Sequence, residues 1–473
     1  MNPADRADLL EIARGRVADG RRLQDAGLLA TNGDFFPSVH YPPITMYKPI
    51  SQEDLFAGYT LPGDGLFDIY AHIPFCKQRC VYCHYPVKFG EQTAEKEKYL
   101  AALEREMDIY RGVLGIDRIP ARSILIGGGT PTYLTPQQLR HFLDYFTGRL
   151  DMSRCTQFNY DLDPNTILGE DGAERMRIMR DHGVDRLTIG INSLDPAILK
   201  TMNRHHTLEQ ALESVEASRK LGFKLNIEFI FGYPGQTLES WVEEMDLAMS
   251  LDVDEIQLYR LKVEAYGDFQ GPIKDVTRRE PLRVPGDETT LTMKKIAIDM
   301  LTAGNFTENI RRVFGRSRKI YSHYAWNQCC MLYDEIGFGL TAFSSLRDRF
   351  VLNTQYFDEY YAAIEAGRLP LNRGLVRNQE EQERWSIILP VKNSFVNKAI
   401  FKERTGVPLE SVYREKIARL KEHGLLVEDD AKLQATRLGA FYADELAQQF
   451  HSPDYIPFPR EEYADGALNP YRP

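Results

Sequence analysis

The chain has 473 residues, of which 43% are hydrophobic and 27% charged, a balance typical of globular proteins. Its formal net charge of −10 argues against a dedicated nucleic-acid binder, which would present a basic face. No apolar run approaches the roughly 20 residues that cross a bilayer, and residues 1–6 lack the apolar core of a signal peptide. We therefore expect a cytoplasmic protein without nucleic-acid or membrane partners.

Residues 1–62 are predicted to form an extension that packs over the next domain. A helical stripe near the start is made by Leu9, Leu10, Ile12, Ala13 and Val17. Pro-rich, aromatic chain follows at residues 35–37 and 41–43, where no regular period is present. Such a segment cannot build a core of its own.

Residues 63–285 alternate between strand and helix patterns. Strand-like runs cover residues 67–73, 122–126, 157–162, 186–191, 225–231 and 255–259. Helical patterns lie between them, near residues 93–112, 136–148, 168–182, 207–221 and 237–250. Strands joined by helical crossovers pair in parallel. We therefore predict an α/β fold built on a parallel (β/α)6 partial TIM barrel, whose chemistry gathers at the C-terminal ends of its strands.

The rest of the chain is predicted as two further segments. Residues 286–375 are expected to connect the barrel to the C-terminus and to cover the active site. They contain a basic run, Arg311, Arg312, Arg316, Arg318 and Lys319. A solvated basic turn is the favoured interpretation of this run, and a site for several carboxylates is the alternative. Residues 376–473 suggest a C-terminal helical, winged-helix-like α+β domain, with Gly424 ending a helix before a short hairpin.

The six cysteines divide into a crowded trio and three scattered residues. The trio is Cys76, Cys80 and Cys83. Without an export signal, this crowding indicates a metal centre and not a disulfide framework. Cys155 is predicted to be a small core residue, and the Cys329-Cys330 pair to be buried packing with a redox role as the alternative.

The C-x3-C-x2-C spacing of the trio places three thiolates on one loop directly after the first predicted strand. Thiolates are the ligands of iron–sulfur clusters, and three of them leave one iron open to a small molecule. A structural zinc site would need a fourth ligand, for which His84 is the candidate. Because adjacent Cys83 and His84 would chelate one ion awkwardly, we favour a cluster.

The segment from Tyr70 to Cys83, YAHIPFCKQRCVYC, resembles the cysteine motif of the radical S-adenosylmethionine (SAM) superfamily. Its HIPF sequence resembles the HemN-like branch, named for oxygen-independent coproporphyrinogen III oxidases. The resemblance extends over roughly residues 60–450. It implies a [4Fe–4S] cluster on Cys76, Cys80 and Cys83 that binds SAM through the open iron. An electron would then split SAM to give a 5′-deoxyadenosyl radical.

Later strand ends carry residues that match the same family. Gly127-Gly128-Gly129-Thr130 follows the second strand and resembles the methionine-binding motif, where glycines let backbone groups approach a ligand. Polar residues end the next strands or follow them closely, at Asp161, Asn192, Arg204 and Glu228. Each alone fits a surface or core position. Together they lie where the barrel rule requires functional residues.

The resemblance implies that two SAM molecules share these positions. The residues of the cluster-bound molecule would be Tyr70, Gly128 and Asp161. The second molecule would be held by Tyr82, Gly129, Thr130, Asn192, Arg204 and Glu228. Asp161, Asn192 and Glu228 replace the Glu, Gln and Asp that are common in the family, so the chemistry is kept and the side-chain length changes. No catalytic residue is assigned.

Tyr85 is the clearest departure from the oxidases, which carry a further cysteine at that position. It motivates a first hypothesis of radical C-methylation or cyclopropanation of an unsaturated small molecule, as in other HemN-like enzymes. One alternative is an oxygen-independent coproporphyrinogen III dehydrogenase that oxidatively decarboxylates propionates. The other is a haem-binding chaperone without turnover. The resemblance further implies a monomer that receives electrons from a donor such as flavodoxin or ferredoxin.

Overall fold

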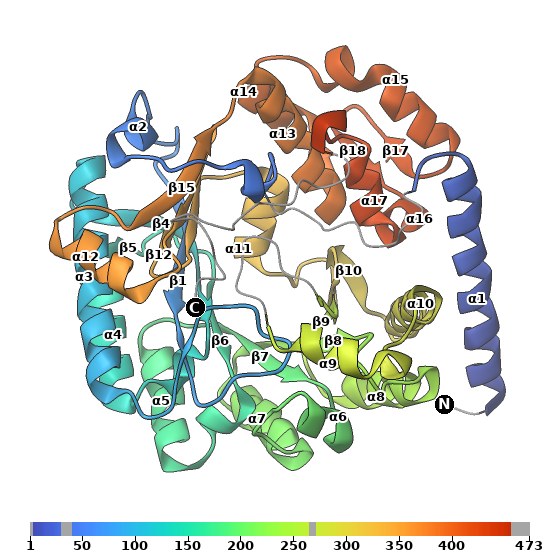
Figure 1. The fold of residues 1–473 in the computed structure, drawn as a ribbon, viewed down its shortest axis with the longest axis horizontal. Coiled ribbons are helices and arrows are strands. Elements are labelled where there is room, and N and C mark those ends of the chain that lie inside the picture. Colours follow the sequence, from blue (N-terminus) through green and yellow to red (C-terminus); the bar gives the residue numbers. More distant parts are fainter. Residues whose placement is uncertain (1–2, 30–39, 264–270, 456–473) are drawn as a thin grey trace.

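The computed structural model of the chain describes residues 3–29, 40–263 and 271–455. A large sheet lined on its outer side by helices fills most of the molecule, and a smaller domain, orange to red, lies beside one end of it (Figure 1). No described helix is long and apolar enough to cross a membrane. The predicted stripe side chains at positions 9, 10, 12, 13 and 17 and residues 35–37 lie outside what the structure describes.

Seven neighbouring strands of the sheet run parallel, in the spatial order β9-β8-β7-β6-β4-β1-β12. They are β1 (Phe67–Ile73), β4 (Ile119–Gly128), β6 (Phe158–Leu162), β7 (Arg186–Asn192), β8 (Lys224–Phe231), β9 (Glu255–Arg260) and β12 (Glu335–Phe338). The helices between them are α3 (Thr93–Leu114), α4 (Pro136–Gly148), α5 (Gly169–Asp181), α6 (Pro196–Thr201), α7 (Leu208–Lys220) and α8 (Leu238–Ser250). Among the described strands no pairing joins the two ends of the order, β10 and β15. The predicted partial barrel is confirmed, with β12 as an additional parallel strand.

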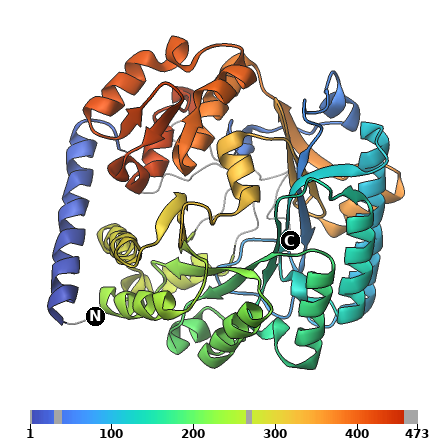
Figure 2. The ribbon, with the colours of Figure 1, turned by 180° about the vertical axis from the view of Figure 1, so that it is seen from behind.

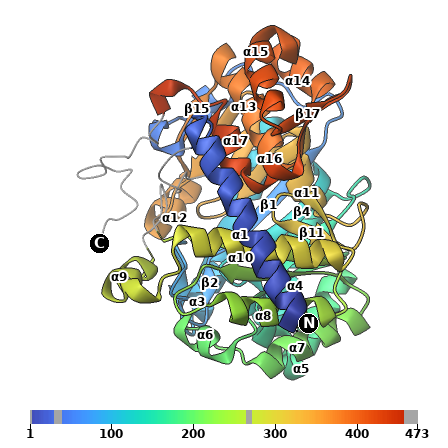
Figure 3. The same ribbon diagram turned by 90° about the vertical axis from the view of Figure 1, so that its right-hand side faces the viewer.

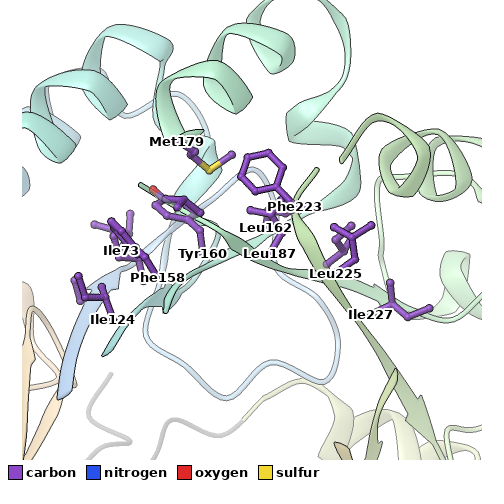
Figure 4. Close-up of a cluster of buried hydrophobic side chains, with 14 of the residues drawn as sticks. Ile73, Ile124, Phe158, Tyr160, Leu162, Met179, Leu187, Phe223, Leu225 and Ile227 are labelled. Atoms are coloured by element: carbon purple, nitrogen blue, oxygen red, sulfur yellow. The ribbon is translucent and has the colours of Figure 1, made fainter. Parts of the chain in front are cut away.

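The strands of the barrel have one apolar and one polar face, because successive side chains of a strand point to opposite sides. On β1, Ile69 and Ile73 are buried under the helices, whereas Asp68, Tyr70 and His72 lie on the inner face. Figure 4 shows the outer layer, in which Met179 and Phe223 pack with the apolar side chains of the neighbouring strands. The interior of this barrel is therefore polar, and so it differs from the branched apolar interior of ordinary TIM barrels.

An ion pair and hydrogen bonds connect polar side chains of different strands across the inner face of the barrel. The Arg186 guanidinium lies 2.6 Å from the Glu255 carboxylate, and both side chains are buried. Arg186 also donates to Asn159 Oδ1 over 2.6 Å. A buried charge is stable only when it is paired and hydrogen-bonded, and these contacts supply that condition.

The amino ends of β1 and β12 form a second polar layer. Asp68 and Glu335 are neighbours across these strands. Burial raises the pKa of Glu335 to about 8 and that of Asp68 to about 7. Tyr324 and Asn327 donate hydrogen bonds to Glu335 and Asp68 from α11 (His323–Trp326) and the following π-helical turn η5 (Asn327–Met331). These two elements cover the amino ends of the strands, which leaves the carboxyl ends for a ligand.

The segment 286–375 differs from its expected role as a connection, because it contributes six strands to the sheet. Next to β9 lies β11 (Val313–Gly315), antiparallel to it, and β10 (Thr307–Ile310) pairs antiparallel with β11. Beyond β12 lie β13 (Phe343–Leu346), β14 (Arg349–Asn353) and β15 (Leu371–Val376). These strands are three to six residues long, too short for a clear alternating pattern in the sequence. The other elements of the segment are α10 (Asp287–Ala303) and α12 (Phe357–Glu365).

The C-terminal domain has the predicted winged-helix-like order. It contains α13 (Gln379–Asn393), β16 (Phe395–Asn397), α14 (Lys398–Thr405), α15 (Leu409–Glu422), β17 (Leu426–Glu428), β18 (Lys432–Ala435), α16 (Arg437–Phe441) and α17 (Ala443–Gln448). Gly424 follows α15 with φ +73°, as a helix-ending glycine requires. The first helix, α1 (Pro3–Asp25), runs across α10 and ends against this domain, where Leu23 and Leu28 join its core (Figures 2 and 3).

Replacing Gly337 by Ala should lower the free energy of unfolding by about 1–3 kcal/mol, because a side chain there overpacks the core. A Cβ at Gly337 would lie 2.2 Å from the Phe343 carbonyl oxygen, which is backbone and cannot turn aside. Gly112, an exposed position of α3 with nothing within 4 Å of a Cβ, is the control. Gly112→Ala should raise stability by about 0.5–1 kcal/mol. Urea unfolding of both variants measures this, and equal stabilities would contradict the close packing of β12 on β13.

Candidate active site

The cysteine loop leaves the carboxyl end of β1 and is held by backbone contacts at both ends. After β1, β2 (Phe75–Cys76) pairs with β3 (Lys88–Phe89). Further along the loop, the Val81 N–H donates to Met202 O over 3.0 Å. Asn203 Nδ2 donates to Arg79 O over 2.7 Å. The turn after α6 thus fixes the loop on which Cys80 and Cys83 lie.

The surroundings of the sulfur atoms suit an iron–sulfur cluster. Burial, together with the nearby Cys83 and Cys80, raises the pKa of the Cys76 thiol to about 12. A thiolate there needs compensating positive charge, which iron would supply. Thr130 Oγ1 donates to Cys76 Sγ over 3.5 Å, and Arg204 Nη1 donates to Cys80 Sγ over 3.2 Å. Hydrogen bonds of this kind stabilise an anionic cluster.

His84 does not face the sulfur atoms as a fourth zinc ligand would. Its Nδ1 accepts a hydrogen bond from the Gly271 N–H over 3.0 Å, and its Nε2 lies 3.0 Å from Lys262 O. Among the described residues, no three His, Cys, Asp or Glu side chains surround a point where a single metal ion could bind. A cluster can accept more widely spaced thiolates, because each of them binds a different iron. His84 is therefore engaged away from the thiols and is not placed as the fourth zinc ligand that the sequence offered.

The three glycines at the carboxyl end of β4 are required by close approaches to the site. A Cβ at Gly127 would lie 2.7 Å from Asp161 Oδ2, and one at Gly129 would lie 2.8 Å from the Phe75 carbonyl oxygen. Gly128 has φ +115°, and a Cβ there would lie 2.9 Å from the His72 ring. The glycine run thus lets the chain pass directly beside the cysteine loop.

Two half-buried carboxyl groups line the inner face, Asp161 near the carboxyl end of β6 and Glu228 in the middle of β8. Asp161 accepts from Asn159 Nδ2 over 2.9 Å, and Glu228 accepts from Tyr259 Oη over 3.1 Å. Burial raises the pKa of Asp161 to about 6. Burial, followed by the charge of Asp161, raises the pKa of Glu228 to about 7. The two groups therefore influence each other, and a ligand with hydroxyl or ammonium donors would satisfy them.

Arg204 joins the cysteine loop to the barrel. Its Nη2 donates to Asp163 Oδ2 over 2.5 Å and to Gly190 O over 2.6 Å. Burial alone would raise the pKa of Asp163, but Arg204, with His206 and His205 beside it, holds that pKa well below its usual value. Arg204, predicted to hold the second SAM molecule, is thus already paired with a carboxylate of the chain. Its buried Nε has no hydrogen-bond partner within the described part of the protein.

The remaining predicted residues lie around the same centre. Tyr70 Oη is 2.9 Å from His72 Nδ1, and Arg204 Nη1 donates to Tyr82 Oη over 3.4 Å. Asn192 has φ +67°, and its side chain donates to Gly190 O over 2.9 Å. The structure therefore brings together all the residues that the sequence analysis assigned to the cluster and to SAM. Their individual contacts with SAM stay a prediction.

Three site residues were not selected from the sequence. Asp163 is the partner of Arg204, and Tyr259 is the partner of Glu228. His72 is buried, and its Nε2 has no hydrogen-bond partner in the described ranges. The two-residue period could have found the first two, because Asp163 follows Asp161 and Tyr259 follows Gln257 on the same face of the chain.

Comparison with known proteins assigns the family. The radical SAM superfamily model matches residues 70–248, and the HemN C-terminal domain model matches residues 393–442. The haem chaperone HemW of Bacillus subtilis is 26% identical over 80% of this chain and 98% of its own length. The oxygen-independent coproporphyrinogen III oxidase of Helicobacter pylori strain J99 is 24% identical over 87% of this chain and 92% of its own length. The chain is a HemN-like radical SAM protein.

The solved structure of coproporphyrinogen III oxidase (HemN) from Escherichia coli has the same fold. It superposes with a TM-score of 0.75 over 88% of this chain and 96% of its own, at 20% identity. Membership of the radical SAM family implies a [4Fe–4S] cluster and SAM. The residues of this HemN-like protein fit both groups, because three thiols, of which Cys76 and Cys80 accept hydrogen bonds, lie beside a glycine run and two half-buried carboxyl groups.

Proposed function

We propose that this HemN-like protein is an oxygen-independent oxidase that decarboxylates propionate side chains of coproporphyrinogen III. The observation that best supports SAM cleavage is the position of Arg204. Its guanidinium donates hydrogen bonds both to the predicted cluster ligand Cys80 and to Asp163, which follows β6. The oxidase type is supported by the Helicobacter pylori relative, whose similarity extends over both domains.

The residues of the chain have distinct roles in this proposal. The bound cluster and SAM supply a 5′-deoxyadenosyl radical. Thr130 and Arg204 hold the sulfur atoms of Cys76 and Cys80 by hydrogen bonds. Asp161 accepts hydrogen bonds from a SAM molecule bound to the cluster. Removal of one hydrogen atom and one electron from a propionate, with release of carbon dioxide, leaves a vinyl group, so an electron acceptor completes each turnover.

Glu228 and Asn192 hold a second SAM molecule in the same proposal. Glu228 lies on β8, two strands away from Asp161 on β6, and Asn192 ends the intervening strand β7. The electrostatic interaction between Asp161 and Glu228 supports two adjacent cofactor positions, because each carboxyl needs its own donor to remain ionised.

Tyr85 favoured C-methylation or cyclopropanation as the first hypothesis from the sequence. The relatives instead favour its two alternatives, the oxidase and the haem chaperone. The relatives that align with most of the chain are named as oxidases or haem chaperones. Those names give carbon transfer no support. Tyr85 is exposed, and its ring lies 5.9 Å from that of His72. Because this position holds a tyrosine, the chain lacks the thiol that the oxidases carry there.

A haem chaperone without turnover is the second candidate. Two observations favour it, namely Tyr85 in place of the additional cysteine and the similarity to HemW over nearly the whole length of that protein. In this case the cluster and the polar wall would serve haem transfer and not decarboxylation.

The decisive experiment supplies the anaerobically reconstituted full chain with coproporphyrinogen III, dithionite, an electron acceptor and SAM labelled on its methyl carbon. The oxidase proposal expects 5′-deoxyadenosine, carbon dioxide and an unlabelled product that has lost carboxyl groups. Cys80→Ala is the control and should give none of these.

Two other results would each reject the oxidase proposal. Label in the product together with S-adenosylhomocysteine would restore carbon transfer. No substrate-dependent 5′-deoxyadenosine, with haem retained by the protein through gel filtration, would establish the chaperone.

A further inference from the structure

Arg312 occupies the turn between β10 and β11 in a backbone conformation that is rare for arginine. Its φ is +70°, in the left-handed region that favours glycine or asparagine. The turn is fixed on both sides, because the Arg312 N–H donates to Glu308 Oε1 and its carbonyl accepts from the Leu258 N–H over 2.9 Å. The guanidinium therefore starts from an anchored point beside β9.

The guanidinium of Arg312 lies on the wall that carries Glu228. It is 6.0 Å from the centre of the Tyr259 ring, and the Tyr259 hydroxyl donates to Glu228. The side chain makes no hydrogen bond and no ion pair with any described residue. A partly buried guanidinium with five N–H donors and no acceptor is an incomplete site.

The neighbouring basic residues are satisfied, so the predicted solvated turn does not describe the whole run. Arg311 pairs with Asp444, and Arg316 donates to Val253 O over 3.1 Å. Arg318 and Lys319 are exposed, as the interpretation of a solvated turn requires. Of the five, only Arg312 is both partly buried and without a polar side-chain partner in the part of the chain that the structure describes.

Two carboxylates near Arg312, those of Asp444 and Glu308, already have partners other than its guanidinium. Asp444 is shared by Arg311 and by Lys392, whose Nζ lies 3.3 Å from Asp444 Oδ1. Glu308 already accepts from the backbone at Arg312. Burial, followed by the charge of Arg311, lowers the pKa of Arg312 to about 10, against the opposing charges of Asp444 and Glu308. A cation in such surroundings is stabilised by an anionic ligand.

We propose that Arg312 binds a carboxylate of a ligand that lies beside Glu228 and Tyr259. A carboxylate fits best, since its two oxygens match the planar fork of a guanidinium. The inference rests on the proposed function for the ligand's identity. The carboxylate belongs either to a propionate of the tetrapyrrole substrate or to the amino-acid end of the second SAM.

The test is equilibrium binding to the cluster-reconstituted full chain, with no turnover required. Two pairs of probes differ only in carboxylates, namely coproporphyrin III against its tetramethyl ester, and SAM against decarboxylated SAM. Arg312→Gln should lower the affinity for one of the two carboxylate-bearing probes, coproporphyrin III or SAM, by about tenfold or more. It should leave the carboxylate-free member of that pair unchanged, which also shows that the variant is folded. Arg318→Gln, exposed in the same basic run, should bind all four probes as the wild type does.

Each outcome has one meaning. A loss confined to coproporphyrin III assigns Arg312 to the substrate, and a loss confined to SAM assigns it to the cofactor. Arg312→Lys should recover part of either loss, because it restores the charge without the fork. Equal affinity of wild type and Arg312→Gln for both acids overturns the inference. If the wild type does not bind coproporphyrin III, the proposed substrate is wrong. The comparison of SAM with decarboxylated SAM then tests the role of Arg312 independently.

Discussion

Replacing Cys76, Cys80 or Cys83 by Ala should abolish cluster binding after anaerobic reconstitution. The broad visible absorbance and the iron content should fall to background in each variant. The reason is geometric, because these three thiols lie at the carboxyl end of β1 and no other cysteine lies at that edge of the sheet. Cys155 precedes the amino end of β6, and Cys329 and Cys330 lie in η5, beside the amino end of β12.

Cys155→Ala is the matched control, because its thiol is also partly buried, packs against the core and donates a hydrogen bond to Gln157 O over 3.5 Å. It should bind the cluster as the wild type does. A colourless wild-type protein that carries one zinc would contradict the cluster, and a Cys80→Ala variant that kept full absorbance would contradict the assignment of the ligands.

Replacing Arg204 by Leu should lower the free energy of unfolding of the cluster-free protein by about 3–5 kcal/mol, as is typical when one partner of a buried ion pair is lost. The side chains of Arg204 and Asp163 are 9% and 5% exposed, so the remaining carboxylate would be buried without its cation. In the wild type burial lowers the pKa of His205 and of His206, so Arg204 is the cation that compensates the Asp163 carboxylate. Urea unfolding measures the loss.

A double-mutant comparison separates this ion pair from general damage. Adding Asp163→Asn to Arg204→Leu should recover part of the stability, because the unpaired charge is removed. Arg219→Leu, which breaks an exposed pair with Glu216, should cost at most about 1 kcal/mol. A loss in Arg204→Leu no larger than in Arg219→Leu would show that Asp163 does not depend on Arg204.

Much of the barrel could be predicted because its signals are local in the chain. The apolar outer residues of β1, β6, β7 and β8 recur at every second position. Capping residues such as Thr135 and Thr207 begin α4 and α7 with side-chain hydrogen bonds to the third residue. The short strands β10 to β15 gave no such signal, because they are stabilised by their neighbours in the sheet and not by their own pattern.

The sequence by itself determined the chemistry of the site, since the spacing of three cysteines and the glycine run identify a thiolate loop beside a close-approach segment. It also placed Asp161 and Glu228 on parallel strands, a topology that directs functional groups toward one edge of the sheet.

Only the tertiary structure decided how these residues are paired. Arg204 meets Asp163 and Cys80 across separations of 41 and 124 residues, and Arg312 reaches the Glu228 wall through a strand that pairs with β9. Such contacts depend on the order of the strands and on the twist of the sheet, and neither can be predicted from the local periodicity of the sequence. The same holds for Arg312, whose lack of a polar side-chain partner within the described ranges can be recognised only from the positions of the surrounding residues.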